Sequence, residues 1–139
     1  MLNADADAAL QAARTAQANA YAPYSNFRVG CVIEAADGQL YRGCNVENAS
    51  YGLTLCAERV ALSCAVVAGQ RTFRRLVLVT DAPQPVAPCG ACRQMLVEFS
   101  PSLEIVSYSR DGAVRSWALD ALLADRFELP PASHEGTHR

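Results

Sequence analysis

The stretch LVLVTDAPQPVAPCGACRQMLVEF, residues 76–99, decides the fold that the sequence predicts. Its first four residues form a short run of branched apolar side chains, which is typical of a strand buried on both faces. Three prolines between residues 81 and 88 predict a loop. Residues 89–99 predict a helix that Ser100-Pro101 ends, and residues 103–108 predict another strand. A helix between two strands indicates α/β architecture.

The remaining elements are predicted from hydrophobic periodicity and turn residues on either side of this stretch. Further helices are expected at residues 5–20, 56–68 and 118–124. Further strands are expected at residues 27–33, 39–46 and 113–117. Asp37-Gly38 is a strong hairpin signal between the first two of these strands.

Together these elements predict an α/β fold, a three-layer α/β/α sandwich with a mixed five-stranded sheet and helices on both faces. The length of 139 residues suits one domain with a sizeable core. We expect this domain to span residues 1–128. The tail, residues 129–139, is rich in proline and polar residues and is expected to be flexible.

Composition excludes several kinds of catalysis. All 12 basic residues are arginine, and the two histidines, His134 and His138, lie within the last six positions. Schiff-base chemistry and the P-loop need lysine, and serine or cysteine triads need a well-placed histidine. A net charge of −2 argues against a nucleic-acid partner. Carboxylate or metal chemistry remains.

The chain is expected to be cytoplasmic and to have no membrane partner. Its first seven residues are acidic where a secretory peptide would be basic. No apolar run approaches the ~18 residues needed to span a bilayer. In a reducing compartment, the six cysteines are better explained as thiols or metal ligands than as disulfides.

Three cysteines have the arrangement of a metal site. Cys89 and Cys92 form a CxxC pair at the start of one predicted helix, and Cys56 begins the preceding helix. A right-handed crossover would bring both helix N-termini to one edge of the sheet, where their N–H groups favour thiolates. Three protein ligands are typical of a catalytic zinc, which keeps its fourth position for water. The sequence therefore predicts one Zn²⁺ on these three thiolates.

Two residues beside Cys56 complete the predicted chemistry. Glu58 is close enough in sequence to reach over the metal-bound water as an acid/base without being a ligand. Three thiolates on one divalent ion leave a net negative charge, which makes that water a weaker acid. Arg59 is predicted to offset this charge by hydrogen bonding to the sulfurs.

Other interpretations remain open at this point. A CxxC pair also occurs in redox proteins, and zinc can be purely structural; Glu58 is the residue that distinguishes these from a hydrolase. The remaining cysteines are expected to be small buried hydrophobic residues: Cys31, Cys44 and Cys64. His134-Glu135-Gly136-Thr137-His138 matches the letters of a metalloprotease motif, but it lacks the helical context that this motif needs.

The cysteines and glutamate match the signature of the zinc nucleobase deaminases, Cys56-x-Glu58 with Pro88-Cys89-x-x-Cys92. Three longer segments closely resemble the short, homotetrameric cytidine deaminases of pyrimidine salvage: residues 22–27 (APYSNF), 43–51 (GCNVENASY) and 88–94 (PCGACRQ). The resemblance extends from the first helix to about Phe127. It implies a zinc-dependent hydrolase that converts cytidine and 2′-deoxycytidine to uridine and 2′-deoxyuridine, and a homotetramer.

The resemblance also implies roles for individual residues. Glu58 would protonate N3 of cytosine and later pass a proton to the departing ammonia. Asn45 and Glu47 would hold the ribose hydroxyls, and Phe27 would pack on the base. Ala57 is implied as a further substrate contact, and Phe127 as an aromatic residue contributed to the site of a neighbouring subunit.

Other deaminases remain as alternatives. Blasticidin-type deaminases share the cysteine core, but the intact Asn45-Val46-Glu47-Asn48 favours a plain nucleoside. Polynucleotide deaminases need a basic channel, and beyond Arg71, Arg74 and Arg75 the chain has no basic cluster.

Overall fold

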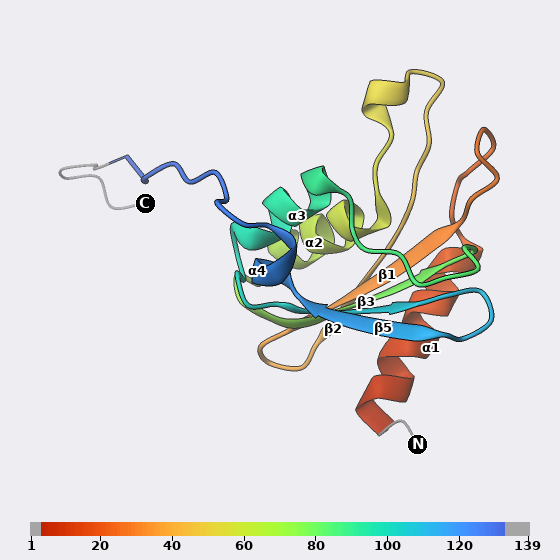
Figure 1. Ribbon diagram of the computed structural model, residues 1–139, viewed down its shortest axis with the longest axis horizontal. Helices are drawn as coiled ribbons and strands as arrows, with labels where there is room; N and C mark the ends of the chain where they lie inside the picture. Colours follow the sequence, from red (N-terminus) through yellow and green to blue (C-terminus); the bar gives the residue numbers. More distant parts are fainter. Residues whose placement is uncertain (1–3, 133–139) are drawn as a thin grey trace.

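The structure is a computed structural model that describes residues 4–132 (Figure 1). A five-stranded mixed sheet has the order β2-β1-β3-β4-β5, and β3 and β4 are its parallel pair. The strands are β1 (Val29–Ala35), β2 (Leu40–Cys44), β3 (Phe73–Thr80), β4 (Glu104–Tyr108) and β5 (Val114–Ala118). The helices are α1 (Ala4–Ala18), η1 (Tyr51–Leu53), α2 (Ala57–Val67), α3 (Gly90–Val97) and α4 (Leu119–Leu122).

Helices cover both faces of the sheet, which confirms the predicted three-layer α/β/α sandwich. Helix α1 lies on one face, and α2 and α3 lie side by side on the other (Figure 1). The alternation in β1 explains this arrangement: Cys31 and Ile33 are buried in the core beneath α2 and α3, whereas Val32 is buried with α1. Both sides of the sheet are therefore apolar.

One glycine allows α2 to approach the sheet closely enough to form the site. A Cβ atom on Gly43 of β2 would lie 2.3 Å from the carbonyl oxygen of Ala57 and 2.5 Å from the amide nitrogen of Ala61. Any larger residue would push away the first turn of α2. Gly43 therefore fixes the height of that turn above the sheet.

The sequence located the elements well and misjudged some details. Strand β3 begins at Phe73, three residues before the predicted start, because its first residues pair with Glu34 and Ala35 of the neighbouring strand β1. A short 3-10 helix, η1, lies between the strand predicted at residues 39–46 and the helix predicted at residues 56–68. Among residues 4–132, no helix is long and apolar enough to cross a bilayer.

The three cysteines predicted to be buried have different environments. Cys31 is fully buried, as predicted. Cys44 is only partly buried, and Cys64 is exposed on the outer side of α2, so the prediction for Cys64 was wrong. The hydrophobic periodicity of α2 is weak enough that a cysteine fits either side of the helix. His134 and His138, with the motif they belong to, lie outside the described residues.

Candidate metal centre and active site

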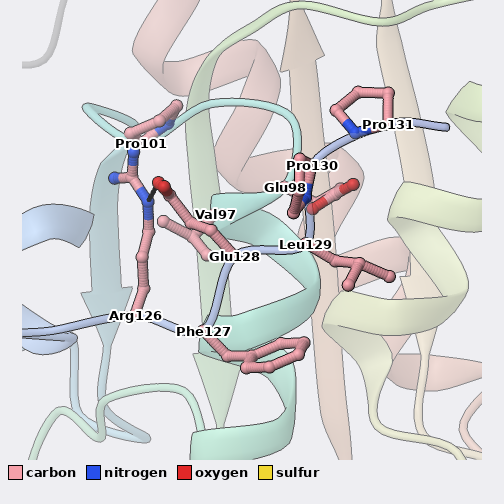
Figure 2. A pocket seen from close by; sticks show the side chains of 9 residues that line it. All are labelled: Val97, Glu98, Pro101, Arg126, Phe127, Glu128, Leu129, Pro130 and Pro131. Atoms are coloured by element: carbon pink, nitrogen blue, oxygen red, sulfur yellow. Dashed lines mark hydrogen bonds and ion pairs between the residues drawn. The ribbon is translucent and has the colours of Figure 1, made fainter. Parts of the chain in front are cut away.

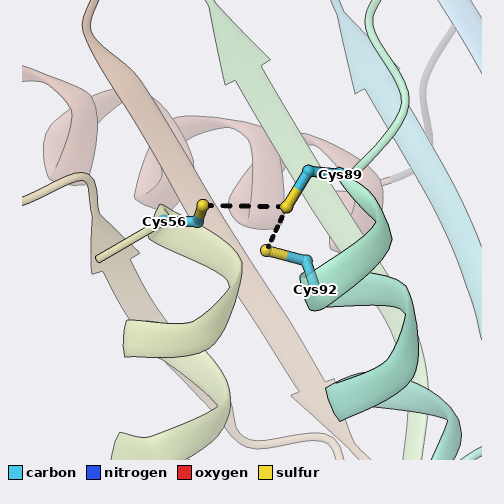
Figure 3. Close-up of side chains that lie close together, drawn as sticks. All are labelled: Cys56, Cys89 and Cys92. Atoms are coloured by element: carbon cyan, nitrogen blue, oxygen red, sulfur yellow. Dashed lines mark hydrogen bonds between the residues drawn. The ribbon is translucent and has the colours of Figure 1, made fainter. Parts of the chain in front are cut away.

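Cys56, Cys89 and Cys92 meet between the N-termini of α2 and α3 (Figure 3). Cys56 is the N-cap residue of α2, Cys89 is the N-cap residue of α3, and neither side chain makes a capping hydrogen bond. Cys92 follows in the first turn of α3 and is fully buried. The three sulfur atoms therefore face one another, and the N–H groups of two helix ends surround them.

The sulfur spacing fits a tetrahedral zinc site. The Sγ atoms of Cys56 and Cys89 are 3.9 Å apart, those of Cys89 and Cys92 are 3.4 Å apart, and all three lie within 4.8 Å of one another. A tetrahedral ion with Zn–S bonds of about 2.3 Å needs sulfurs about 3.8 Å apart. Among the residues that the structure describes, this is the one such group of ligand atoms, so a bound zinc would keep an open coordination position.

Arg59 lies against this thiolate group. Its Nη2 donates to the Sγ of Cys56 at 3.7 Å and to the carbonyl oxygen of Thr54 at 3.1 Å. Hydrogen bonds from Cys92, Arg59 and Cys89 lower the pKa of the Cys56 thiol to about 5, against the opposing effect of burial. The pKa of Arg59 rises through its hydrogen bond to Cys56. The arrangement stabilises a thiolate at Cys56.

Glu58 is a buried carboxyl group beside the sulfurs. Its side chain is 5% exposed and projects from the first turn of α2. Burial raises the pKa of Glu58, and a hydrogen bond with Cys92 partly opposes that rise. A carboxyl group with a raised pKa suits proton transfer near neutral pH.

A cavity of about 250 Å³ opens above Glu58 and Cys56. Its lining is mostly apolar, and its polar side chains come from few residues. The lining residues are Phe27, Val29, Asn45, Thr54, Leu55, Cys56, Ala57, Glu58, Leu78, Thr80, Val86 and Ala87. A mostly apolar pocket with a few convergent polar groups and a carboxyl group of raised pKa is the usual form of a small-molecule site.

Asn45 is buried at the cavity wall and holds the segment that carries Phe27. The Oδ1 atom of Asn45 accepts from the amide of Val29 at 2.9 Å, and its Nδ2 donates to the carbonyl oxygen of Phe27 at 2.7 Å. The Phe27 side chain is 37% exposed and lines the cavity. The second Nδ2 proton of Asn45 has no partner among these contacts and is free for a ligand.

Glu47 lies outside the cavity lining and binds the backbone that leads to Phe27. Its Oε1 accepts from the amides of Tyr24 at 2.9 Å and Ser25 at 3.1 Å, and its Oε2 accepts from the hydroxyl of Ser25. Hydrogen bonds from Ser25 and Tyr24 lower the pKa of Glu47. Glu47 is therefore held ionised and oriented before any ligand arrives.

Phe127 is not brought to this cavity within the chain. It lines a second cavity, with residues from the end of α3 and the following turn and from the C-terminal segment (Figure 2). The Phe127 side chain is 71% exposed, and its carbonyl oxygen accepts from the Nε2 of Gln94 at 3.0 Å. The predicted role of Phe127 in a neighbouring subunit stays a prediction.

The sequence did not identify several residues that contribute to the site. Thr54, Thr80 and Val86 line the cavity without belonging to a recognisable motif. Asp81 holds the Phe27 segment by accepting from the amide of Arg28, 53 positions away. Residue pairs that lie far apart in sequence give no periodic signal, so only a three-dimensional structure reveals them.

Comparisons with known proteins all point to the same family. A family model described as the cytidine and deoxycytidylate deaminase zinc-binding region matches residues 3–108. The chain is 39% identical over 131 residues to a cytidine deaminase of Sporosarcina psychrophila, an alignment that covers 94% of this chain and 96% of that protein.

Solved structures agree. A crystal structure of cytidine deaminase from Burkholderia pseudomallei is similar with a TM-score of 0.84 and 47% identity, covering 91% of this chain and 100% of that one. A crystal structure of cytidine deaminase from Mycobacterium tuberculosis is similar with a TM-score of 0.76 and 40% identity, covering 88% of this chain and 97% of that one.

Proposed function

The chain belongs to the cytidine and deoxycytidylate deaminase family, and we propose that it deaminates cytidine and 2′-deoxycytidine by hydrolysis, the reaction of pyrimidine salvage. Water adds at C4 of the base, the bond from C4 to the exocyclic nitrogen breaks, and uridine or 2′-deoxyuridine is released with ammonia. The observation that carries this proposal is the buried carboxyl group of Glu58, which lines the cavity with Cys56, together with the convergence of the Cys56, Cys89 and Cys92 sulfurs.

Cys56, Cys89 and Cys92 would hold one Zn²⁺ ion per chain. When bound, zinc acts as a Lewis acid that lowers the pKa of water and so supplies a nucleophile at neutral pH. The cysteines contribute by their placement. Their positions at two helix ends bring the three sulfurs within 4.8 Å of one another, and hydrogen bonds lower the pKa of Cys56.

Glu58 is the proton carrier of the reaction. Its carboxylate accepts a proton from the attacking water and donates it to N3 of cytosine. It then accepts the proton of the hydroxyl formed on C4 and donates it to the amino group, which leaves as ammonia. Burial supports this role because it raises the pKa of Glu58 above its ordinary value. Ala57, fully buried beside Glu58 in the cavity wall, supplies a substrate contact through its backbone.

Arg59 compensates the charge of the thiolates. Its hydrogen bond to Cys56 draws electron density from the sulfur, which limits how strongly the three ligands weaken the Lewis acidity of the metal. The same guanidinium is fixed by the carbonyl of Thr54. Arg59 is therefore a positioning and charge-compensating residue rather than one that touches the substrate.

Phe27, Asn45 and Glu47 would bind the nucleoside. The exposed part of Phe27 offers the base an apolar surface, and the free amide proton of Asn45 is available to a sugar hydroxyl. Glu47 keeps one unused lone pair for a sugar hydroxyl, although three donors already hold it. A site with such polar groups discriminates strongly against ligands that leave them unpaired.

We also propose that the protein acts as a homotetramer in the cytoplasm, with residues 1–128 as its catalytic domain. Support comes from exposed apolar side chains: Tyr51 is 80% exposed, Leu53 is 65% exposed, and Phe127, at the second cavity, is 71% exposed. In a tetramer these residues would be covered, and Phe127 would reach a neighbouring site. Light scattering of the purified protein measures the number of subunits directly.

A reducing compartment is supported by the free thiols.

The decisive experiment follows the loss of cytidine absorbance on incubation with zinc-loaded protein. We expect turnover that a chelator abolishes and added zinc restores. A purely structural zinc would give no absorbance change with fully loaded protein, and that result would overturn the proposal.

A further inference from the structure

The segment 24–28 carries Phe27 to the cavity without belonging to a helix or strand. Four of its five backbone N–H groups donate to side chains, and the N–H of Asn26 donates to the carbonyl oxygen of Ala22. Asn45 holds the carbonyl of Phe27 from within the cavity wall. Two further side chains, Ser25 and Asp81, hold the segment from opposite ends, and neither lines the cavity.

Ser25 joins the carboxylate of Glu47 to the backbone of Phe27. Its hydroxyl donates to Oε2 of Glu47 and accepts from the amide of Phe27 at 3.0 Å. Asn26, between Ser25 and Phe27, has a left-handed φ of 56°, which asparagine tolerates better than most residues. The tight turn brings the Ser25 hydroxyl to the amide of Phe27. One hydroxyl group therefore connects Glu47, the proposed sugar contact, with Phe27, the proposed base contact.

Asp81 anchors the other end of the segment. It directly follows β3, and its Oδ2 accepts from the amide of Arg28 at 3.0 Å. Its Oδ1 accepts from the Nε2 of Gln17 at 3.2 Å, and the same Nε2 donates to the carbonyl of Arg28 at 3.1 Å. Gln17 belongs to α1, so both polar backbone groups of the residue after Phe27 are tied to the body of the fold.

On the basis of the proposed function, we propose that Ser25 and Asp81 are positioning residues that hold Phe27 against the base, and that Ser25 also couples Phe27 to Glu47. A dispersion contact weakens within a fraction of an ångström, so the aromatic ring must be held accurately. A segment ordered in advance also lowers the entropic cost of binding. Because neither residue touches the reacting atoms, their loss should raise KM and leave kcat nearly unchanged.

The variants Ser25→Ala and Asp81→Asn test this coupling with two ligands. The kcat and KM are measured with cytidine. The inhibition constant is measured for 2′,3′-dideoxycytidine, which has the base but lacks the hydroxyls that Glu47 would hold. Asp111→Asn is the matched control for Asp81, because Asp111 is exposed and lies 3.7 Å from its single ion-pair partner, Arg110. Ser25→Thr keeps the hydroxyl and is the conservative variant for Ser25.

We expect Asp81→Asn to raise the KM for cytidine and the inhibition constant for dideoxycytidine by the same factor, about tenfold, since it acts through Phe27 alone. Ser25→Ala should raise the KM for cytidine by about tenfold or more, and the inhibition constant for dideoxycytidine by clearly less. Only cytidine has the hydroxyls that Glu47 would hold. Ser25→Thr and Asp111→Asn should resemble the starting protein. Zinc content and kcat should stay within about twofold throughout.

Three results would overturn the inference: an unchanged KM in Asp81→Asn, an equal effect of Ser25→Ala on both ligands, or a fall in kcat at constant KM. Turnover of cytidine by the unaltered protein would still uphold the proposed function in each case. If the zinc-loaded unaltered protein did not turn over cytidine, the proposed function would fail, and the inference with it. Should Asp81→Asn not fold, Gln17→Ala removes the amide that binds both Asp81 and Arg28. The same equal rise for both ligands is then expected, and its absence contradicts the inference.

Discussion

The two sides of the cavity are built in different ways. On the thiolate side, Cys56 and Cys89 are N-cap residues of α2 and α3, so the backbone of regular helices places their sulfurs. On the nucleoside side, Phe27 and Glu47 lie in loops that are held by hydrogen bonds between side chains and backbone. Loss of one metal ligand should abolish metal binding, whereas loss of one hydrogen bond in the loops should lower nucleoside affinity only in part. Substitutions on the two sides should therefore have different effects on activity.

The largest effect is expected when a metal ligand is removed. Cys92 is fully buried and completes the group of three sulfurs. Cys92→Ala should leave two ligands, too few for a stable zinc site, and deamination should fall to background. Zinc content by atomic spectroscopy and cytidine absorbance measure both losses. Cys64→Ala, on the exposed side of α2, is the matched control and should keep its zinc and its activity. Stoichiometric zinc in Cys92→Ala would contradict the assignment.

The second effect separates proton transfer from metal binding on the same side. Glu58→Gln keeps the shape of the side chain but removes the exchangeable proton. We expect full zinc content, an unchanged fold and a loss of kcat of about 10²- to 10⁴-fold. Glu98→Gln, at the exposed C-cap of α3, is the control and should have normal activity. A Glu58→Gln enzyme with nearly normal kcat would remove Glu58 from the reaction.

The sequence could predict the thiolate side because its information is local. Cys89 and Cys92 lie one helical turn apart, and Cys56 and Glu58 begin one helix, so spacing alone brings these groups together once the helices are recognised. The alternation of strands and helices likewise predicted the layers of the fold. The crossover between α2 and α3 then needed only one topological rule to bring the two helix ends to one edge.

The nucleoside side was predicted by resemblance to a family, and its supports were not predicted at all. Asp81 binds residue 28, which lies 53 positions away, and Glu47 binds Ser25 across 22 positions. Neither contact has a periodicity, and each residue taken alone resembles a solvated loop residue. The exposure of Cys64 was also missed, since cysteine is compatible with both core and surface.

The third effect lies on the nucleoside side and should be graded. Asn45 is 7% exposed and makes two hydrogen bonds to the backbone around Phe27. Asn45→Ala should leave the amide of Val29 and the carbonyl of Phe27 without these partners, and lower kcat/KM by about 100-fold, mainly through KM, with a fall in stability of about 2 kcal/mol. Zinc content should not change. Asn19→Ala, at the exposed end of α1, is the control. Loss of zinc in Asn45→Ala would show that the two sides are not independent.

The smallest effect should come from Arg59, which belongs to the thiolate side but acts in a graded way. Its guanidinium donates to Cys56 and Thr54 without ligating the metal. Arg59→Gln retains an amide of similar direction but loses the positive charge, and zinc affinity measured by competition with a chromophoric chelator should fall by about tenfold. Arg71→Gln is the control, because Arg71 donates only to the backbone of Val66 and Gln70.

At saturating zinc, Arg59→Gln should retain most of its affinity for cytidine, since no cavity-lining group is altered. An unchanged zinc affinity would mean that two helix N-termini alone stabilise the thiolates, and a raised KM at full zinc occupancy would mean that Arg59 also supports the nucleoside side.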